Sequence, residues 1–206
     1  MHVPPSRTAF VFDLAGVLLE WDPLPLYLDV INGERGRAQH FLSSVMGDAA
    51  QREISAGRAV DAVLAECSER TPEFSEAIYA WRSRWQEMLR GEIAGSVAVL
   101  GELRERGYPT FALGNWSREE FEWARPRFGF LDGFDDVLLS GDCGVLKPDA
   151  EIFRRAEACF SLQPSQTVFI DDRPANAEAA VALGWNGLVF EDPRQLYRVL
   201  MDYGYL

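Results

Sequence analysis

Carboxylates follow two apolar segments of the chain, at the point where each segment ends. Asp13 comes directly after the run at residues 9–12, and Asp171 and Asp172 come directly after the run at residues 167–170. Short apolar runs bounded by turn residues are typical of strands buried in a parallel sheet. Ligands of such sheets bind beyond the carboxyl ends of the strands. We therefore expect the three carboxylates to converge on one crevice.

Three converging carboxylates repel one another, and they need a cation if all are to be ionised together. Oxygen ligands of this kind suit Mg²⁺, which keeps several waters and is often shared with substrate phosphate. Lys147 lies just past a third apolar run and is the only lysine, because arginine makes up 19 of the 20 basic residues. A compact ammonium group at this position supplies a second positive charge. The pattern predicts a magnesium site with Asp13 at its centre.

Apolar runs and helix-period segments alternate along most of the chain. Three more runs, at residues 110–113, 137–139 and 187–190, have the composition of buried strands. Segments with apolar residues at helical spacing, such as 97–103 and 152–160, lie between them. This alternation predicts an α/β fold with a doubly wound, parallel, Rossmann-like sheet.

One region breaks the alternation. No convincing strand occurs between Trp21 and Leu89, and helix signals are found instead at residues 34–46, 59–67 and 72–89. We expect a small α-helical cap domain above the strand ends, because the insertion leaves from the turn after Asp13. The expected division is a core domain of residues 8–20 and 92–206 and a cap domain of residues 21–91.

Four motifs carry a resemblance to a known family. They are Phe12-Asp13-Leu14-Ala15-Gly16-Val17-Leu18, then Leu113-Gly114-Asn115-Trp116-Ser117, then Lys147-Pro148-Asp149, and finally Phe169-Ile170-Asp171-Asp172 with Asn176. Their order and spacing resemble the haloacid dehalogenase (HAD) superfamily, and they look most like bacterial phosphatases of sugar phosphates that carry a helical cap. The resemblance covers nearly the whole chain.

The resemblance implies a role for each matched residue. Asp13 would be the nucleophile that accepts the phosphoryl group, and Lys147 would neutralise charge between it and the phosphoryl oxygens. Magnesium would be bound by Asp13, the carbonyl of Ala15 and Asp172, with Asp171 holding the metal or its waters. The substrate would be bound by Gly114, Asn115, Lys147 and Asn176. Asn115 would offer a backbone or side-chain donor to the phosphate, and Asn176 would orient the loop or Lys147.

Two positions depart from the pattern of the family's phosphatases. Ala15 stands where these enzymes usually carry a second aspartate that acts as general acid and base. Such help is typically worth about 10²–10⁴-fold in rate. Gly114 stands where a serine or threonine usually donates a hydroxyl to the phosphate. An acceptor left without that bond costs about 1–3 kcal/mol.

The preferred hypothesis is a magnesium-dependent phosphatase that hydrolyses a small phosphoester, for which a sugar phosphate is one candidate. The first alternative is a non-catalytic protein that binds metal or a phosphorylated ligand. A 2-haloacid dehalogenase is less favoured, because dehalogenases of the family need no metal and lack the Asp-Asp pair. Substrate specificity would come from the helical region. Trp21, Tyr27, Trp116 and Arg118 are candidates to line the crevice, with core packing as the alternative.

Net charge and cysteine usage limit the kinds of partner and the cellular compartment that we expect. A formal net charge of −12 argues against nucleic acid and anionic membrane, so a small phosphorylated metabolite is expected. The three cysteines lack metal-ligand spacing, which favours free thiols in a reducing cytoplasm. Residues 1–7 have no apolar core, so we expect no signal peptide there. The sequence sets no expectation for the oligomeric state.

Overall fold

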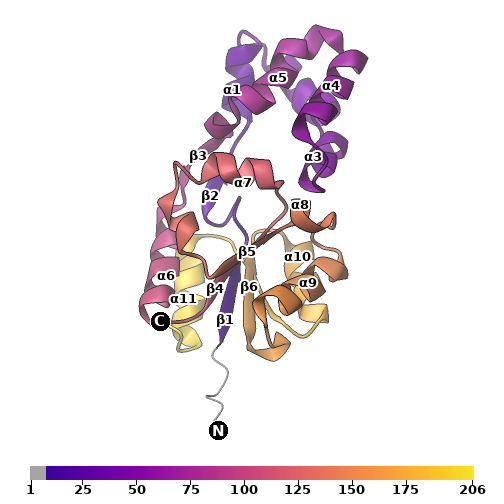
Figure 1. Ribbon diagram of the computed structural model, residues 1–206. Coiled ribbons are helices and arrows are strands. Elements are labelled where there is room, and N and C mark those ends of the chain that lie inside the picture. The colour runs from indigo at the N-terminus through magenta and orange to yellow at the C-terminus, as the bar shows by residue number, and fades with distance from the viewer. Residues whose placement is uncertain (1–7) are drawn as a thin grey trace.

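A five-stranded parallel sheet forms the centre of the larger part of the molecule (Figure 1). The computed structural model describes residues 8–206, so the N-terminal segment expected to lack a signal peptide lies outside the described residues. In sheet order the strands are β5 (Asp136–Leu139), β4 (Thr110–Gly114), β1 (Ala9–Phe12), β6 (Thr167–Asp171) and β7 (Asn186–Val189). Each lies within one residue of an apolar run in the sequence, and the predicted α/β fold is confirmed.

Alternating side chains of the strands bury both faces of the sheet. Phe10 and Phe12 pack in one cluster with residues of α6 (Ala94–Glu105) and α11 (Pro193–Asp202). Ala9 and Val11 pack in another with residues of α9 (Ala150–Phe160) and α10 (Pro174–Ala182). Figure 1 shows these two helix layers on opposite sides of β1. Burial on both faces explains why the strands are continuous apolar runs.

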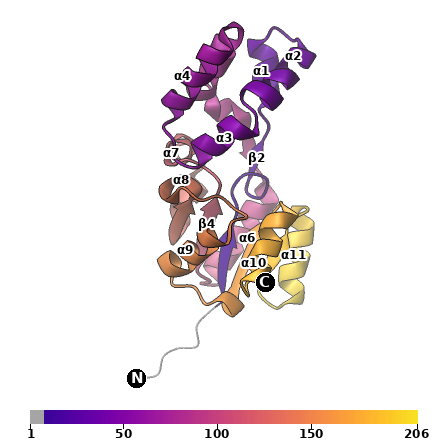
Figure 2. The same cartoon turned by 90° about the vertical axis from the view of Figure 1, so that its right-hand side faces the viewer.

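A helical insert, defined as residues 24–88, lies above the carboxyl ends of the strands (Figures 1 and 2). Its elements are α1 (Leu24–Val30), α2 (Arg35–His40), the π-helical turn η1 (Phe41–Val45), α3 (Asp48–Ser55), α4 (Val60–Arg70), η2 (Pro72–Phe74), α5 (Ser75–Ser83) and η3 (Trp85–Met88). The helix expected over residues 34–46 changes to π geometry at Phe41, and that expected over residues 72–89 is interrupted by two 3₁₀ segments. Helix α3 was not predicted, because it buries only Ala50 and Ile54 and so carries a weak apolar stripe.

A two-stranded antiparallel ribbon joins the insert to the sheet. It consists of β2 (Leu19–Trp21) and β3 (Leu89–Glu92), which pair with each other as a separate two-stranded sheet. The expectation of no strand near Trp21 and Leu89 is thus wrong at both ends of the insertion. Strands of three and four residues carry almost no periodic signal, and here pairing between distant segments creates them.

A second set of contacts ties the insert to the loops beyond the sheet. The loops after β4 and β5 carry α7 (Arg118–Ala124) and the short helix α8 (Ser140–Cys143), whereas the 3₁₀ segments η4 (Gly129–Gly133) and η5 (Pro164–Gln166) precede β5 and β6 at the opposite edge of the sheet. Ser140 Oγ donates to the carbonyl of Ser55 at 2.5 Å, and Gln86 Nε2 donates to the carbonyl of Trp123 at 2.9 Å. Since these contacts lie on both sides of the strand ends, the insert covers the strand ends.

Candidate active site and metal centre

A buried lysine joins two buried aspartates at the carboxyl ends of β1 and β6. Lys147 Nζ lies 2.8 Å from Asp13 Oδ1 and 2.7 Å from Asp171 Oδ2, and it also donates to the carbonyl of Leu113 at 2.7 Å. All three residues are less than a tenth exposed. Burial alone would lower the pKa of Lys147, but the two carboxylates outweigh that effect and raise it. The lysine is therefore a fixed positive charge.

The turn after β1 holds Asp13 and presents backbone toward Asp172. The Asp13 amide donates to the carbonyl of Ile170 at 2.9 Å, which fixes the end of β1 against β6. Gly16 has a φ of +88°, and a Cβ atom there would overlap the carboxylate of Asp172. Only glycine allows this approach. The carbonyl oxygen of Ala15 accepts no hydrogen bond from residues 8–206 and remains available as a ligand.

Asp171 is fully enclosed by donors. Besides the lysine, its Oδ1 accepts from the Arg173 amide and from Asn176 Nδ2, each at 2.9 Å. Asn176 was expected to orient the loop or Lys147. Its amide instead contacts Asp171, and it affects the lysine only through that carboxylate. Asp171 thus anchors Lys147, while Asp172 is the more exposed member of the pair.

Asn115 braces the loop that carries Lys147. Its Nδ2 donates to the Lys147 carbonyl at 3.0 Å, and its Oδ1 accepts from the Lys147 amide at 2.8 Å. A side-chain donor to phosphate was one of two expectations for Asn115. Because the Asn115 side chain already bonds the Lys147 backbone, the backbone amide of Asn115 is the donor that is left for the phosphate. A Cβ at Gly114 would lie 3.2 Å from Leu14 Cδ1, so the Leu14 side chain limits the room for a hydroxyl here.

The donor set fits a divalent cation. One carboxylate oxygen from each of Asp13, Asp171 and Asp172 lies within 4.8 Å of the others. Burial raises the pKa of Asp13 to about 7 despite the opposing effect of Lys147, and Asp171 adds to the rise. Partial burial and the charge of Asp171 also raise the pKa of Asp172. One lysine facing three carboxylates leaves excess negative charge, and Mg²⁺ with its oxygen ligands would balance it.

A two-lobed cleft lies beside these residues, between the insert and the sheet. The larger lobe, about 550 Å³, includes Lys147, Arg52 and Arg173 in its wall. The smaller lobe, about 100 Å³, includes Ala15. Both share Gln51, Ser55 and Asn115. Arg52, Gln51 and Ser55 were not predicted to line the cleft, because all three lie on α3, the helix that was not predicted. Arg173 could have been noticed, since it directly follows the Asp-Asp pair.

Of the four residues that were candidates to line the crevice, two line it and two do not. Trp21 and Trp116 line the smaller lobe. Tyr27 lies in the core of the insert, with its ring centroid 4.5 Å from that of Phe41. Arg118 pairs with Asp142 at the surface. The last two therefore have structural roles.

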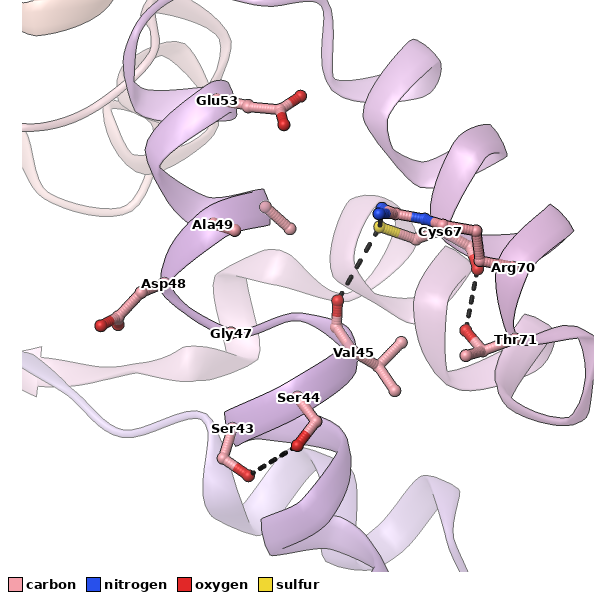
Figure 3. A pocket seen from close by; sticks show the side chains of 11 residues that line it. Ser43, Ser44, Val45, Gly47, Asp48, Ala49, Glu53, Cys67, Arg70 and Thr71 are labelled. Atoms are coloured by element: carbon pink, nitrogen blue, oxygen red, sulfur yellow. Dashed lines mark hydrogen bonds between the residues drawn. The ribbon is translucent and has the colours of Figure 1, made fainter.

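A separate hollow of about 340 Å³ lies within the insert (Figure 3). Its polar groups are already engaged: the Cys67 thiol donates to the Val45 carbonyl at 3.8 Å, and the Thr71 hydroxyl donates to the Cys67 carbonyl at 2.8 Å. Glu53 is paired with Arg58. This hollow lacks converging catalytic groups among the described residues, so the cleft at the strand ends is the candidate site.

Comparisons with known proteins agree with this geometry. Residues 8–184 match the haloacid dehalogenase-like hydrolase family. A phosphoserine phosphatase of Thermus thermophilus is 32% identical over 61% of this chain and 51% of its own length. A flavin mononucleotide hydrolase of Arabidopsis thaliana is 38% identical over 30% of this chain and 25% of its own length. A HAD family enzyme of Bacteroides thetaiotaomicron, in complex with magnesium and inorganic phosphate, has a TM-score of 0.73 at 21% identity, covering 93% of this chain and 100% of that chain.

The chain belongs to the haloacid dehalogenase-like hydrolases, because the family match covers most of it. The matches also include 2-haloacid dehalogenases. The likeness to the Bacteroides enzyme shows a shared fold. The chain spans only a quarter to a half of the two curated relatives described above, so their substrates do not carry over.

Among the described residues, none of the helices has the length and apolar character needed to cross a membrane.

Proposed function

We propose that this protein is a magnesium-dependent phosphatase that hydrolyses a small phosphoester through an aspartyl-phosphate on Asp13. The observation that carries the proposal is the buried Asp13–Lys147–Asp171 arrangement, with the carboxylate of Asp172 beside it. A carboxylate nucleophile held against a fixed positive charge supplies the positioning and charge stabilisation that phosphoryl transfer requires.

Each residue has a distinct task in this proposal. Asp13 attacks the phosphorus, and Lys147 neutralises negative charge on Asp13 and on the phosphoryl oxygens. Asn176 and the Arg173 amide hold Asp171, which in turn holds the lysine. Asp13, the Ala15 carbonyl and Asp172, with Asp171 behind them, would hold Mg²⁺, which stabilises charge on the transferring group when bound. The backbone amide of Asn115 donates a hydrogen bond to the phosphate.

Hydrolysis of a panel of small phosphoesters tests the proposal. Phosphate release from sugar phosphates, nucleotides and phosphoglycolate is measured with Mg²⁺ and with chelator, and release is expected only with Mg²⁺. Chloride release from 2-chloropropionate in chelator is measured in parallel and is expected to be absent. Chloride release without phosphate release would favour the dehalogenase. Tight Mg²⁺ binding without either product would favour a binding protein.

Restoring the missing acid gives a second prediction. Ala15→Asp is expected to raise turnover of alkyl phosphates by about 10²-fold, because a carboxyl at this position can protonate a poor leaving group. Turnover of p-nitrophenyl phosphate should change little, since its leaving group needs little protonation. Steady-state rates on both substrates provide the measurement. Ala15→Asn is the matched control and should give no gain; an equal gain in the Asn variant would contradict proton transfer as the cause.

Further expectations from the sequence stay proposals. We propose that residues 21–91 act as a cap domain on the core of residues 8–20 and 92–206, that the partner is a small phosphorylated metabolite, and that the protein works in the cytoplasm. The hydrogen bonds that join the insert to α7 and α8 support the proposed cap domain. Limited proteolysis with and without phosphate and Mg²⁺ tests it, because a cap should be protected when the cleft is filled.

A further inference from the structure

The smaller lobe of the cleft has walls of indole. It lies between the insert and the sheet, and it is lined by Ala15, Trp21, Gln51, Ser55, Trp81, Asn115, Trp116 and Glu120. The rings of Trp21 and Trp81 meet at a centroid distance of 6.0 Å, at 63° to each other. Trp85 supports the wall from behind, 5.5 Å from Trp21 and 5.4 Å from Trp116. Because these residues come from both the insert and the core, the lobe exists only when the two are together.

A buried carboxyl group completes this lobe. Glu120 is 4% exposed. Its Oε2 accepts from the amide and the hydroxyl of Ser117, at 2.9 and 3.0 Å. Its Oε1 takes part in no hydrogen bond of good geometry with any residue from 8 to 206, and no basic side chain in that range pairs with it. A buried carboxyl without a cation is uncommon, because desolvation of its charge is costly.

Two indole N–H groups lie near this carboxyl. Trp81 Nε1 and Trp85 Nε1 are buried and, among residues 8–206, have no hydrogen-bond partner of good geometry. Burial raises the pKa of Glu120, and the amide and hydroxyl of Ser117 and the two indoles lower it only in part. The lobe therefore combines aromatic side chains with a buried carboxyl that meets only neutral donors, namely Ser117 and the two indoles.

Helix capping explains part of this arrangement. Ser117 and Glu120 form a capping box at the start of α7, which uses Oε2. A capping box needs neither burial of the glutamate nor three tryptophans around it. Two other acidic residues of the same helix are not buried, and each pairs with an arginine: Glu119 with Arg82 and Glu122 with Arg125.

We infer that this lobe binds a cationic group on the alcohol part of the substrate, so that the preferred substrates are phosphomonoesters of amino alcohols. Aromatic faces attract organic cations through their quadrupoles, and tryptophan is the strongest of them. A carboxylate at the base of such a cage compensates the charge. The inference rests on the proposed phosphatase function of the same site.

The position of Ala15 supports this assignment. Ala15 lines the lobe and lies two residues after the proposed nucleophile. A group joined to the phosphoester oxygen by a short carbon chain would enter the lobe while the phosphoryl group lies over Asp13. The methyl side chain of Ala15 leaves that path open, whereas the usual aspartate would narrow it. The missing acid and the indole lobe are then two aspects of one substrate preference.

A pair of isosteric substrates tests the inference without any mutation. Phosphocholine and 3,3-dimethylbutyl phosphate have the same shape, but only the first carries a positive charge. We expect kcat/KM with Mg²⁺ to be about 10- to 30-fold higher for phosphocholine, as a desolvated cation–π contact would give. Equal values, or a preference for the neutral ester, would overturn the inference, while hydrolysis of both would leave the phosphatase proposal standing.

A binding measurement separates this inference from catalysis. Choline and 3,3-dimethylbutanol are titrated into the wild-type protein. Occupancy of the lobe is followed by tryptophan fluorescence, because Trp21, Trp81 and Trp116 line it. Saturable quenching by choline alone supports the cationic site even if no ester is hydrolysed. Equal responses, or no response to either, would count against it.

The carboxyl contribution is tested by Glu120→Gln, which keeps an acceptor oxygen for the α7 cap. The phosphocholine preference over the neutral ester should fall to about 2- to 5-fold, the range that a cation–π contact gives without a compensating carboxylate. Glu122→Gln, on the exposed side of the same helix, is the matched control and should keep the wild-type ratio. A wild-type ratio in Glu120→Gln would overturn the role of the carboxyl.

Discussion

Replacing Lys147 with methionine is expected to remove both activity and much of the stability of this protein. Lys147 Nζ lies within 2.8 Å of both Asp13 and Asp171, and all three are buried. Removing one partner of a buried charge cluster typically costs about 3–5 kcal/mol, because the remaining charges lose their compensation. Loss of one preorganised charge at a reacting group costs about 10²–10³-fold in rate or more. Urea denaturation in chelator and hydrolysis of p-nitrophenyl phosphate with Mg²⁺ measure the two effects.

The Lys147→Arg variant separates charge from shape. The ammonium group donates to three oxygens that lie in different directions at 2.7–2.8 Å. A planar guanidinium is larger and donates in a fixed fork, so it cannot reproduce these contacts. We expect turnover to remain severely reduced despite the conserved charge. Arg155→Met, at an exposed position on α9, is the control and should behave as wild type. Normal turnover in Lys147→Arg would show that the single lysine has no special role.

Replacing Asp13 with asparagine is expected to abolish hydrolysis while leaving the fold intact. An amide cannot accept the phosphoryl group, and loss of a nucleophile costs on the order of 10⁴-fold or more. Asparagine keeps an oxygen for Lys147 Nζ, so the local packing should persist. Steady-state hydrolysis of p-nitrophenyl phosphate with Mg²⁺ gives the activity, and Asp202→Asn at the exposed end of α11 is the control. Retention of a tenth of wild-type turnover would exclude Asp13 as the nucleophile.

Stability of the Asp13→Asn variant gives an independent check. Burial raises the pKa of Asp13 to about 7 in the folded protein, from an ordinary value of 3.8. A carboxyl with a raised pKa stabilises the fold at low pH and loses that contribution as pH rises through the folded pKa. In chelator and above pH 7, the variant should therefore unfold at higher urea than wild type. The reverse order would mean that Lys147 fully compensates the Asp13 charge.

The sheet and the centre of the site were predictable from local sequence. The runs that became β1, β4 and β6 are buried on both faces, so apart from Thr110 and Thr167 at their starts they are apolar and the signal is strong. Because parallel strands all present their carboxyl ends on one edge, the residues after these runs had to converge. The sequence therefore predicts that Asp13, Lys147 and Asp171 lie close together, and in the structure the lysine contacts both aspartates.

The detailed roles of the two asparagines were less accessible to the sequence. Asn115 was expected to offer a backbone or side-chain donor to the phosphate, and the structure uses its side chain to hold the backbone of Lys147. Asn176 was assigned to the loop or to Lys147, but it donates to Asp171. A motif specifies that an amide lies near the site. Which of several neighbouring donors and acceptors it meets depends on distances that only the folded chain fixes.

The smaller lobe could not have been predicted. Trp81 and Trp85 are spaced as a helical stripe, for which packing inside the insert is the usual explanation. Glu120 follows Ser117 at capping-box spacing, which indicates a helix start and nothing more. These residues come together only because the ribbon of β2 and β3 brings the insert over the loop after β4. The composition of this lobe is thus a property of long-range contacts.

Restoring Mg²⁺ to chelator-treated wild-type protein tests the central claim most directly. Release of p-nitrophenolate from p-nitrophenyl phosphate is followed as Mg²⁺ is added, with Asp172→Asn beside the wild type. We expect no hydrolysis in chelator, saturable recovery with Mg²⁺, and a requirement for about 10–100-fold more Mg²⁺ in the variant. Full hydrolysis in chelator, or none at high protein concentration with Mg²⁺ bound, would contradict a magnesium-dependent phosphatase centred on Asp13.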